Sequence, residues 1–125
     1  MSTSKIIYKN NLRTEAQHIA SGQKILTDAP LDNNGKGEAF SPTDLVATAL
    51  ASCMITIMAI AAEKNGINLL ETSASVKKIM GTNPRTISDV IIEITMSKDL
   101  DLKDRKRLEK AALACPVHKL SLIHI

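Results

Sequence analysis

Apolar and polar residues alternate in several short segments of the chain, a pattern typical of strands that bury one face. Turn-forming residues separate these segments: Asn10 and Asn11 follow the first, and Ser21 and Gly22 follow the second. The Ser-Gly pair is a signal for a two-residue hairpin loop. The segments predicted as strands are residues 5–8, 12–19, 23–28, 69–80 and 86–97. We therefore expect three strands near the N-terminus and a long antiparallel hairpin in the second half.

A run without formal charge, residues 45–62, lies between the two groups of strands. Its start carries the signals of a helix, because Ser41 suits the N-cap and Pro42 suits the first helical position. Asp44 completes a capping box with Ser41. Gly66 suits the position just after a helix, where a left-handed backbone is common. The run therefore predicts a helix that begins at Pro42 and ends shortly before Gly66.

A second helix is predicted over residues 101–114. Asp99 or Asp101 can cap its start. The helix should end at Cys115, because a proline disfavours the helical conformation of the residue before it. Residues 119–125, KLSLIHI, can form one last strand. The predicted order is β-β-β-α-β-β-α-β, an α+β arrangement.

The uncharged run is just long enough for a transmembrane helix. It contains six alanines, two threonines and a serine, with no aromatic residue at either end and no flanking basic cluster. These features favour a helix buried inside a globular protein. A chain of 125 residues can hardly cover such a helix alone. We therefore expect a twin helix from a second subunit.

The composition is that of one soluble domain spanning residues 1–125, with a formal net charge of +3. The basic segment KDRKR, residues 103–107, includes an aspartate and has no aromatic residue beside it. It is better interpreted as a solvated helix face than as a nucleic-acid site. The polar start, MSTSKIIYKN, lacks the apolar region of a secretion signal, which predicts a reducing cytoplasm.

The chain has two cysteines, Cys53 within the long predicted helix and Cys115 at the end of the second. Neither lies in a CxxC pair or in a zinc-type cluster, so no metal or cofactor is predicted. By itself, each cysteine is more simply a small buried apolar residue. Cys115 lies at a helix C-terminus, where the helix dipole disfavours a thiolate. It therefore suits a resolving role better than an attacking role.

Two motifs frame these cysteines: SPTDLVATALASCM at residues 41–54 and ACPVHK at residues 114–119. Together they resemble the active-site motifs of the OsmC/Ohr family, the osmotically inducible and organic-hydroperoxide-resistance proteins. The separation of Cys53 from Cys115 and the predicted order of elements agree with this resemblance, which covers nearly the whole chain. It implies an α+β fold with a long buried central helix, assembled as an intertwined homodimer.

The resemblance also implies an activity, that of a thiol-dependent peroxidase that reduces organic hydroperoxides. Cys53 would attack the peroxide and become a sulfenic acid, and Cys115 would condense with it to a disulfide. A dithiol, of the lipoyl type in one branch of the family, would then reduce the disulfide. Neither a nucleic acid nor a membrane is expected as a partner.

The resemblance further implies a cation for the Cys53 thiolate: an arginine from an N-terminal strand, held by a glutamate just before the helix. Arg13 is the only arginine in the N-terminal half and lies on a predicted strand. Arginine keeps its charge when desolvated. Thr43 occupies the position of the family's glutamate, which leaves Asp44 and Glu38 as candidates to orient Arg13. Asp44 can equally be a helix cap alone, and Arg13 a solvent-facing strand residue.

Two other interpretations remain open. The threonine in place of the glutamate also fits an OsmC-like protein that binds a small apolar ligand or senses redox state, with little peroxidase activity. Titration with a hydroperoxide separates the two, because a peroxidase loses both thiols of each chain rapidly. In the third interpretation, the cysteines are incidental buried residues and no mild oxidant joins them.

Overall fold

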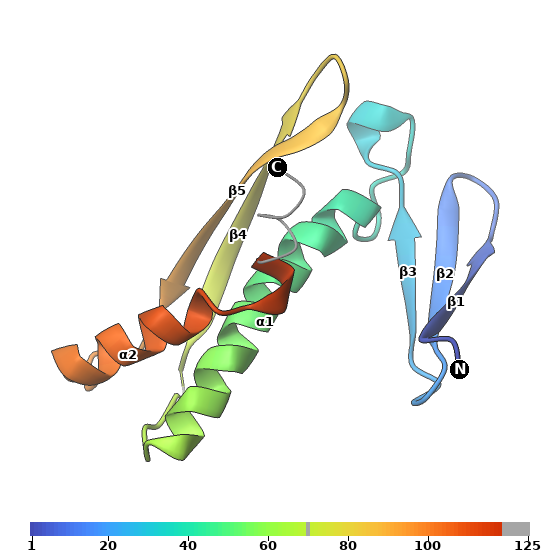
Figure 1. The fold of residues 1–125 in the computed structure, drawn as a ribbon. Helices are drawn as coiled ribbons and strands as arrows, with labels where there is room; N and C mark the ends of the chain where they lie inside the picture. Colours follow the sequence, from blue (N-terminus) through green and yellow to red (C-terminus); the bar gives the residue numbers. More distant parts are fainter. Residues whose placement is uncertain (70, 119–125) are drawn as a thin grey trace. The chain divides into compact units, whose positions relative to one another are not determined.

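The structure, a computed structural model, describes residues 1–69 and 71–118 of the chain. It divides into two compact units, Met1–Leu45 and Val46–Ile125. In chain order the elements are β1 (Ser4–Tyr8), β2 (Arg13–His18), β3 (Lys24–Asp28), the 3-10 turn η1 (Leu31–Asn33), α1 (Pro42–Lys64), β4 (Ser73–Gly81), β5 (Thr86–Thr95) and α2 (Leu102–Ala112) (Figure 1). This is a mixed α+β architecture, as the sequence predicts. The predicted last strand, residues 119–125, lies outside the described residues.

The first three strands form an antiparallel sheet in the order β1-β2-β3. The turn between β1 and β2 takes positive φ at Asn10 and Asn11, which asparagine tolerates better than most residues. Every residue of β1 is exposed, including Ile6 at 65% and Tyr8 at 59%. The sheet therefore leaves much of its apolar surface uncovered within its own unit.

The hairpin between β2 and β3 has a longer loop than predicted. His18 N–H donates to the Gln23 carbonyl at 2.8 Å, so the loop consists of residues 19–22 rather than of Ser21 and Gly22 alone. A two-residue loop would place Pro30 opposite Arg13, whereas the observed register places Asp28 there. The register therefore brings together two side chains of opposite charge.

Helix α1 begins and ends with the motifs that the sequence predicts. Ser41 N–H donates to the Asp44 carboxylate, and Asp44 N–H donates to the Ser41 hydroxyl, each at 3.0 Å. This reciprocal pattern is a capping box. At the other end, Gly66 has a φ of 65°, and Ile67 N–H donates to the Ala62 carbonyl at 2.9 Å. This left-handed end satisfies late carbonyls and stops the helix.

The second unit contains the predicted long hairpin of β4 and β5, whose residues largely alternate between exposed and partly buried positions. Helix α2 begins after Asp101, whose carboxylate accepts the Asp104 N–H at 2.8 Å, so Asp101 is the cap rather than Asp99. The helix ends at Ala112 rather than at residue 114. The buried core of this unit consists of Met58, Ala62, Met96, Leu108 and Ala112.

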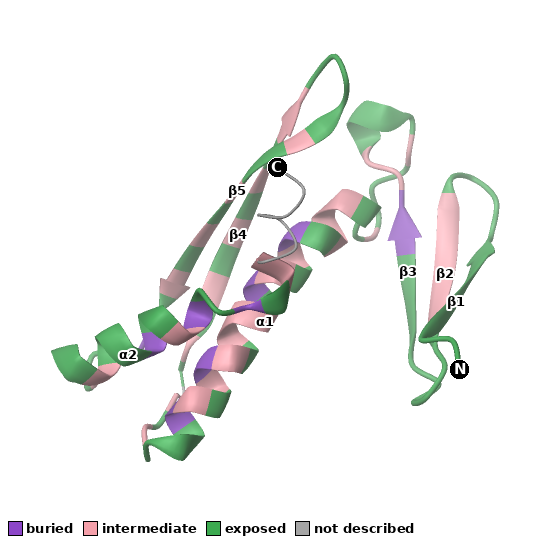
Figure 2. Ribbon diagram, in the orientation of Figure 1, coloured by how far each residue is buried: buried purple, intermediate pink, exposed green. Residues whose placement is uncertain are grey.

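Most of α1 is not buried within one chain, in line with the expectation that a single chain of this length can hardly cover such a helix (Figure 2). Only 22% of its most apolar 18-residue window is buried. Its buried residues are Ala47, Ala51, Met58 and Ala62. By length and composition the helix could cross a membrane, but core helices of soluble proteins share those properties. One chain supplies a core for only one side of the helix, and burial of the other side in a dimer stays a prediction.

Candidate active site

The two cysteines meet in the unit Val46–Ile125. Cys53 lies on α1 and is partly buried, whereas Cys115 follows α2 and has an exposure of 0%. The Cys115 side chain is close enough to be the largest influence on the pKa of Cys53, and neither cysteine is in a disulfide. The structure therefore places side by side the two thiols that the sequence singled out.

A tight turn after α2 brings Cys115 and a backbone amide to Cys53. The N–H groups of Ala114 and Cys115 donate to carbonyls three residues earlier, at 3.0 and 3.3 Å. Pro116 has no N–H, so the next backbone donor is Val117, whose N–H lowers the pKa of Cys53. No pattern in the sequence predicted this amide, because its position depends on the turn after α2.

The surroundings of Cys53 favour its neutral thiol. The hydrogen bond with Cys115, followed by desolvation, raises the pKa of Cys53, and the Val117 N–H offsets part of this rise. Among the described residues of this unit, no cationic side chain contributes to the shift in the pKa of Cys53. A thiolate near neutral pH therefore requires a positive charge in addition to these groups.

In the first unit, Arg13 on β2 is held by a buried aspartate on the neighbouring strand. Arg13 Nε and Nη2 donate to the two carboxylate oxygens of Asp28, at 2.7 and 2.8 Å. The Asp28 side chain is fully buried, whereas that of Arg13 is 30% exposed. The hydrogen bonding between them is the main reason that the pKa of Arg13 is raised and the pKa of Asp28 is lowered.

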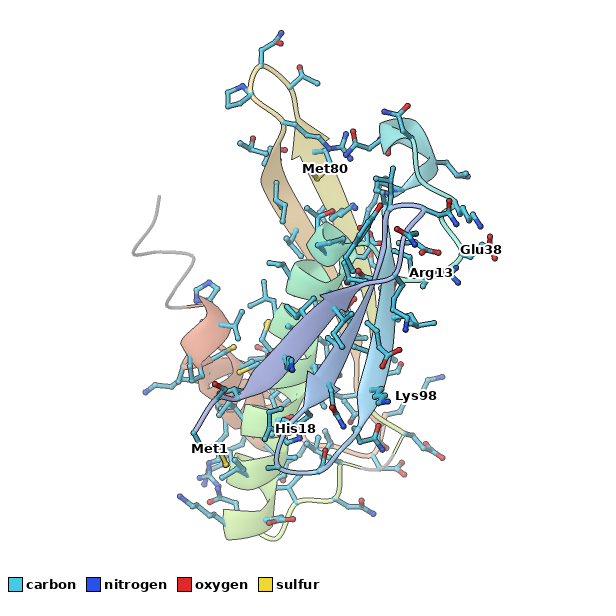
Figure 3. The ribbon with its side chains drawn as sticks, turned by 90° about the vertical axis from the view of Figure 1, so that its right-hand side faces the viewer. Met1, Arg13, His18, Glu38, Met80 and Lys98 are labelled. Carbon is cyan, nitrogen blue, oxygen red and sulfur yellow. The ribbon has the colours of Figure 1, made fainter. Side chains whose placement is uncertain are left out.

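The two carboxylates that the sequence analysis suggested as partners of Arg13, Glu38 and Asp44, make no short hydrogen bond to it among the contacts of the described residues. The Glu38 carboxylate is 64% exposed and lies 3.9 Å from Arg13 Nη2, a loose contact that Figure 3 shows beside the labelled Arg13. Asp44 forms the capping box of α1 with Ser41. The residue with the two short hydrogen bonds to Arg13 is therefore Asp28, which the sequence analysis missed.

A signal for Asp28 was present in the sequence, but the predicted register concealed it. Asp28 is an acidic residue at the end of the apolar segment QKILTD, where a solvent-facing polar residue is expected. With a loop of Ser21 and Gly22 alone, Arg13 would face Pro30, and no partner would be inferred on β3. The four-residue loop corrects this pairing.

The fold and the site define this chain as an α+β protein with two interacting free thiols. Sequence comparison identifies its family. The profile of the family described as OsmC-like protein matches residues 35–123, and the chain belongs to this family. No curated protein matches the chain.

Solved structures share the fold. A Psychrobacter arcticus protein, whose name refers to osmotic stress induction and a detoxification response, is 53% identical, with a TM-score of 0.91 over 95% of this chain and 87% of that one. An OsmC-like protein from Mycoplasma pneumoniae has a TM-score of 0.79 at 14% identity, covering 95% and 85%. An organic hydroperoxide resistance protein OsmC from Legionella pneumophila has a TM-score of 0.67 at 18% identity, covering 96% and 88%. The last two show similarity of fold alone.

Proposed function

We propose that this protein is a thiol-dependent peroxidase that reduces organic hydroperoxides. The observation that carries the proposal is the pair of free, interacting thiols, Cys53 and Cys115, in a chain of the OsmC-like family. Structures of the same fold from Legionella pneumophila and Elizabethkingia anophelis are named organic hydroperoxide resistance proteins, which supports this substrate class.

The proposed reaction has three steps. The Cys53 thiolate attacks the terminal oxygen of the hydroperoxide, the O–O bond breaks, and the alkoxide takes up a proton and leaves as the alcohol. The product is the sulfenic acid of Cys53. The Cys115 sulfur then attacks the Cys53 sulfur, a disulfide forms, and the hydroxyl group leaves as water. A dithiol, for which we propose a lipoyl-type compound, reduces the disulfide by exchange and becomes a disulfide itself.

The burial of the two sulfurs supports this division of roles. Cys53 is partly exposed, so a peroxide can reach it, whereas Cys115 is fully buried. Cys115 is the side chain that influences the pKa of Cys53 most, so it is the nearby thiol available to form a disulfide with Cys53. Cys53 is therefore the attacking thiol in our proposal and Cys115 the resolving thiol.

Arg13 is our candidate for the cation that stabilises the Cys53 thiolate. The groups around Cys53 in its own unit raise its pKa, so the thiolate requires a positive charge. Arg13 keeps its charge at any working pH and is already fixed on one edge by Asp28. Its Nη1 atom makes no hydrogen bond with the described residues, which leaves that edge for a sulfur or a peroxide oxygen.

We also propose that two chains assemble into a homodimer in the cytoplasm, where a reducing environment returns both thiols between turnovers. Between Val46 and Ile60, the exposed residues of α1 recur every three or four positions and are apolar or small. They include Val46 (55% exposed), Ala49, Ser52, Thr56 and Ile60 (46% exposed). A twin α1 would cover this stripe, since small side chains allow close approach of two helices.

Single-turnover experiments with cumene hydroperoxide test the peroxidase. Cys53→Ser should lose turnover completely, because the attacking sulfur is absent. Cys115→Ser should complete one reduction and then accumulate sulfinic acid at Cys53, because no resolving thiol is available. Full turnover by the Cys53→Ser protein would overturn the proposal.

A second candidate function, the binding of a small apolar ligand, is favoured by one cavity. A cavity of about 170 Å³ lies between α1, the end of β5 and α2. Its lining consists of Met54, Met58, Ile94, Met96, Ala112 and Leu113, with the ion-paired Arg105 and Glu109. Flexible methionine side chains adapt to ligands of varied shape. Slow, non-stoichiometric loss of thiols with cumene hydroperoxide would favour this function over the peroxidase.

A further inference from the structure

We propose that Asp28 is the positioning residue that sets the guanidinium of Arg13, in the place that the family resemblance gives to a glutamate at position 43. The inference rests on the proposed function, because it assigns Asp28 a role through Arg13 and Arg13 a role at Cys53. Asp44 and Glu38, the carboxylates expected from the sequence, would then contribute less than Asp28 to orienting the Arg13 guanidinium.

The strand register aligns the two side chains. Arg13 and Asp28 are directly opposite each other in the β2–β3 ladder, so their side chains emerge on the same face of the sheet. The guanidinium donates from two nitrogens to two oxygens, at 2.7 and 2.8 Å. This bidentate contact fixes the plane of the guanidinium as well as its position. A single contact at 3.9 Å, as Glu38 makes, cannot fix that plane.

The loop after β3 holds Asp28 from its other side. Glu38 N–H donates to Asp28 Oδ2 at 3.1 Å, so the loop backbone adds a third hydrogen bond to the carboxylate. Two glycines allow the loop to fold back over Ala29. A Cβ on Gly35 would lie 1.8 Å from the Ala29 carbonyl oxygen, and Gly37 has a φ of 63°. The loop is therefore shaped to bring the Glu38 amide to Asp28.

The charge balance explains why Asp28 can be fully buried. An ionised carboxylate is buried at acceptable cost only when it is paired and hydrogen-bonded. Asp28 accepts three N–H groups, two of them from a cation. Its partner Arg13 stays 30% exposed, so the pair presents one charged edge to the surroundings. This arrangement suits a carboxylate that positions a functional arginine better than it suits a solvent-exposed ion pair.

A double-mutant cycle on the full-length protein tests the inference. The four proteins are the wild type, Asp28→Asn, Arg13→Gln and the double variant, and Asp32→Asn is the matched control because Asp32 is an exposed aspartate of the same unit. The readouts are the rate of Cys53 alkylation by iodoacetamide as a function of pH and the rate of Cys53 oxidation by cumene hydroperoxide. Both rates are corrected for the folded fraction, measured by circular dichroism.

Asp28→Asn should slow Cys53 alkylation at neutral pH by about tenfold and move its pH profile upward by about one unit, as a lost thiolate interaction of that size requires. The same substitution should have no further effect in the Arg13→Gln background, because Asp28 acts through Arg13. Asp28→Glu, which keeps the carboxylate, should recover part of the rate, and Asp32→Asn should equal the wild type.

The outcomes separate this inference from the proposed function. An unchanged rate in Asp28→Asn, or an equal loss in both backgrounds, overturns the role of Asp28 while leaving the peroxidase intact. An unchanged rate in Arg13→Gln overturns the role of Arg13 and that of Asp28 with it. The protein could show the expected coupling of Asp28 and Arg13 in Cys53 alkylation and still reduce no hydroperoxide. That result would support the positioning role of Asp28 and overturn the proposed peroxidase activity. If Asp28→Asn is unfolded, Asp28→Glu replaces it in the cycle. Its effect on the alkylation rate should then be present in the wild-type background and absent in the Arg13→Gln background.

Discussion

At the scale of single residues, neighbouring groups have opposing influences on the pKa of one thiol, that of Cys53. Cys115 and desolvation favour the neutral form of Cys53, and the Val117 amide favours the thiolate. In the proposed mechanism, Cys115 therefore opposes the first step before it serves the second, because it makes the Cys53 thiol less acidic. The two motifs of the sequence indicated which cysteines would meet, but the Val117 contact depends on the turn after α2, which no local pattern specifies.

Replacement of Cys115 by alanine should lower the pKa of Cys53. The substitution removes the largest cause that raises this pKa and leaves the Val117 N–H in place. The thiolate should therefore form at lower pH, and the profile of Cys53 alkylation should shift in that direction. Mass spectrometry of the Cys53 peptide after timed iodoacetamide exposure measures the profile. An unchanged or upward-shifted profile would mean that Cys115 does not control the acidity of Cys53.

At the scale of elements, capping residues marked helix ends more reliably than turn residues marked loop lengths. Ser41 with Asp44, and Gly66, gave the limits of α1 because each satisfies backbone groups that helix ends leave unpaired. Ser21 and Gly22 correctly indicated a hairpin but not its length, since both residues fit a loop of two or of four residues. The uncertain loop length concealed the pairing of Arg13 with Asp28, because the loop length sets the strand register.

The capping box of α1 provides a stability prediction. Ser41→Ala removes the hydroxyl that accepts the Asp44 N–H and leaves that buried end of the helix without its cap. We expect the free energy of unfolding to fall by about 1 kcal/mol, the usual value of such a cap. Urea unfolding followed by circular dichroism measures the change, and Ser75→Ala on β4 is an exposed control. Equal stability of the two variants would show that the capping box contributes nothing.

At the scale of the whole molecule, the chain leaves many large apolar side chains exposed. Helix α1 is buried along one side only, and β1 exposes Ile6, Ile7 and Tyr8. Large exposed apolar patches usually mark interaction surfaces. A second subunit was predicted from the length of the uncharged run, and it stays a prediction. The sequence could not predict which side of α1 would stay exposed, because that depends on where β5 and α2 pack.

An Ile60→Glu substitution tests the proposed homodimer. Ile60 is 46% exposed on the uncovered stripe of α1, so a charge there would be desolvated on both sides of a two-fold interface. The variant should be largely monomeric by size-exclusion chromatography with light scattering, whereas the wild type should be a dimer. Leu102→Glu, at an exposed helix N-terminus, should remain a dimer. A wild-type monomer would contradict the proposal directly.

The most direct test of the central claim is the fate of the two thiols after reaction with one equivalent of cumene hydroperoxide. Peptide mapping under non-reducing conditions should find a Cys53–Cys115 disulfide within one chain, formed together with one alcohol per hydroperoxide consumed. A lipoyl-type dithiol should restore both free thiols. Recovery of both thiols unmodified, or of disulfides only between chains, would contradict the account.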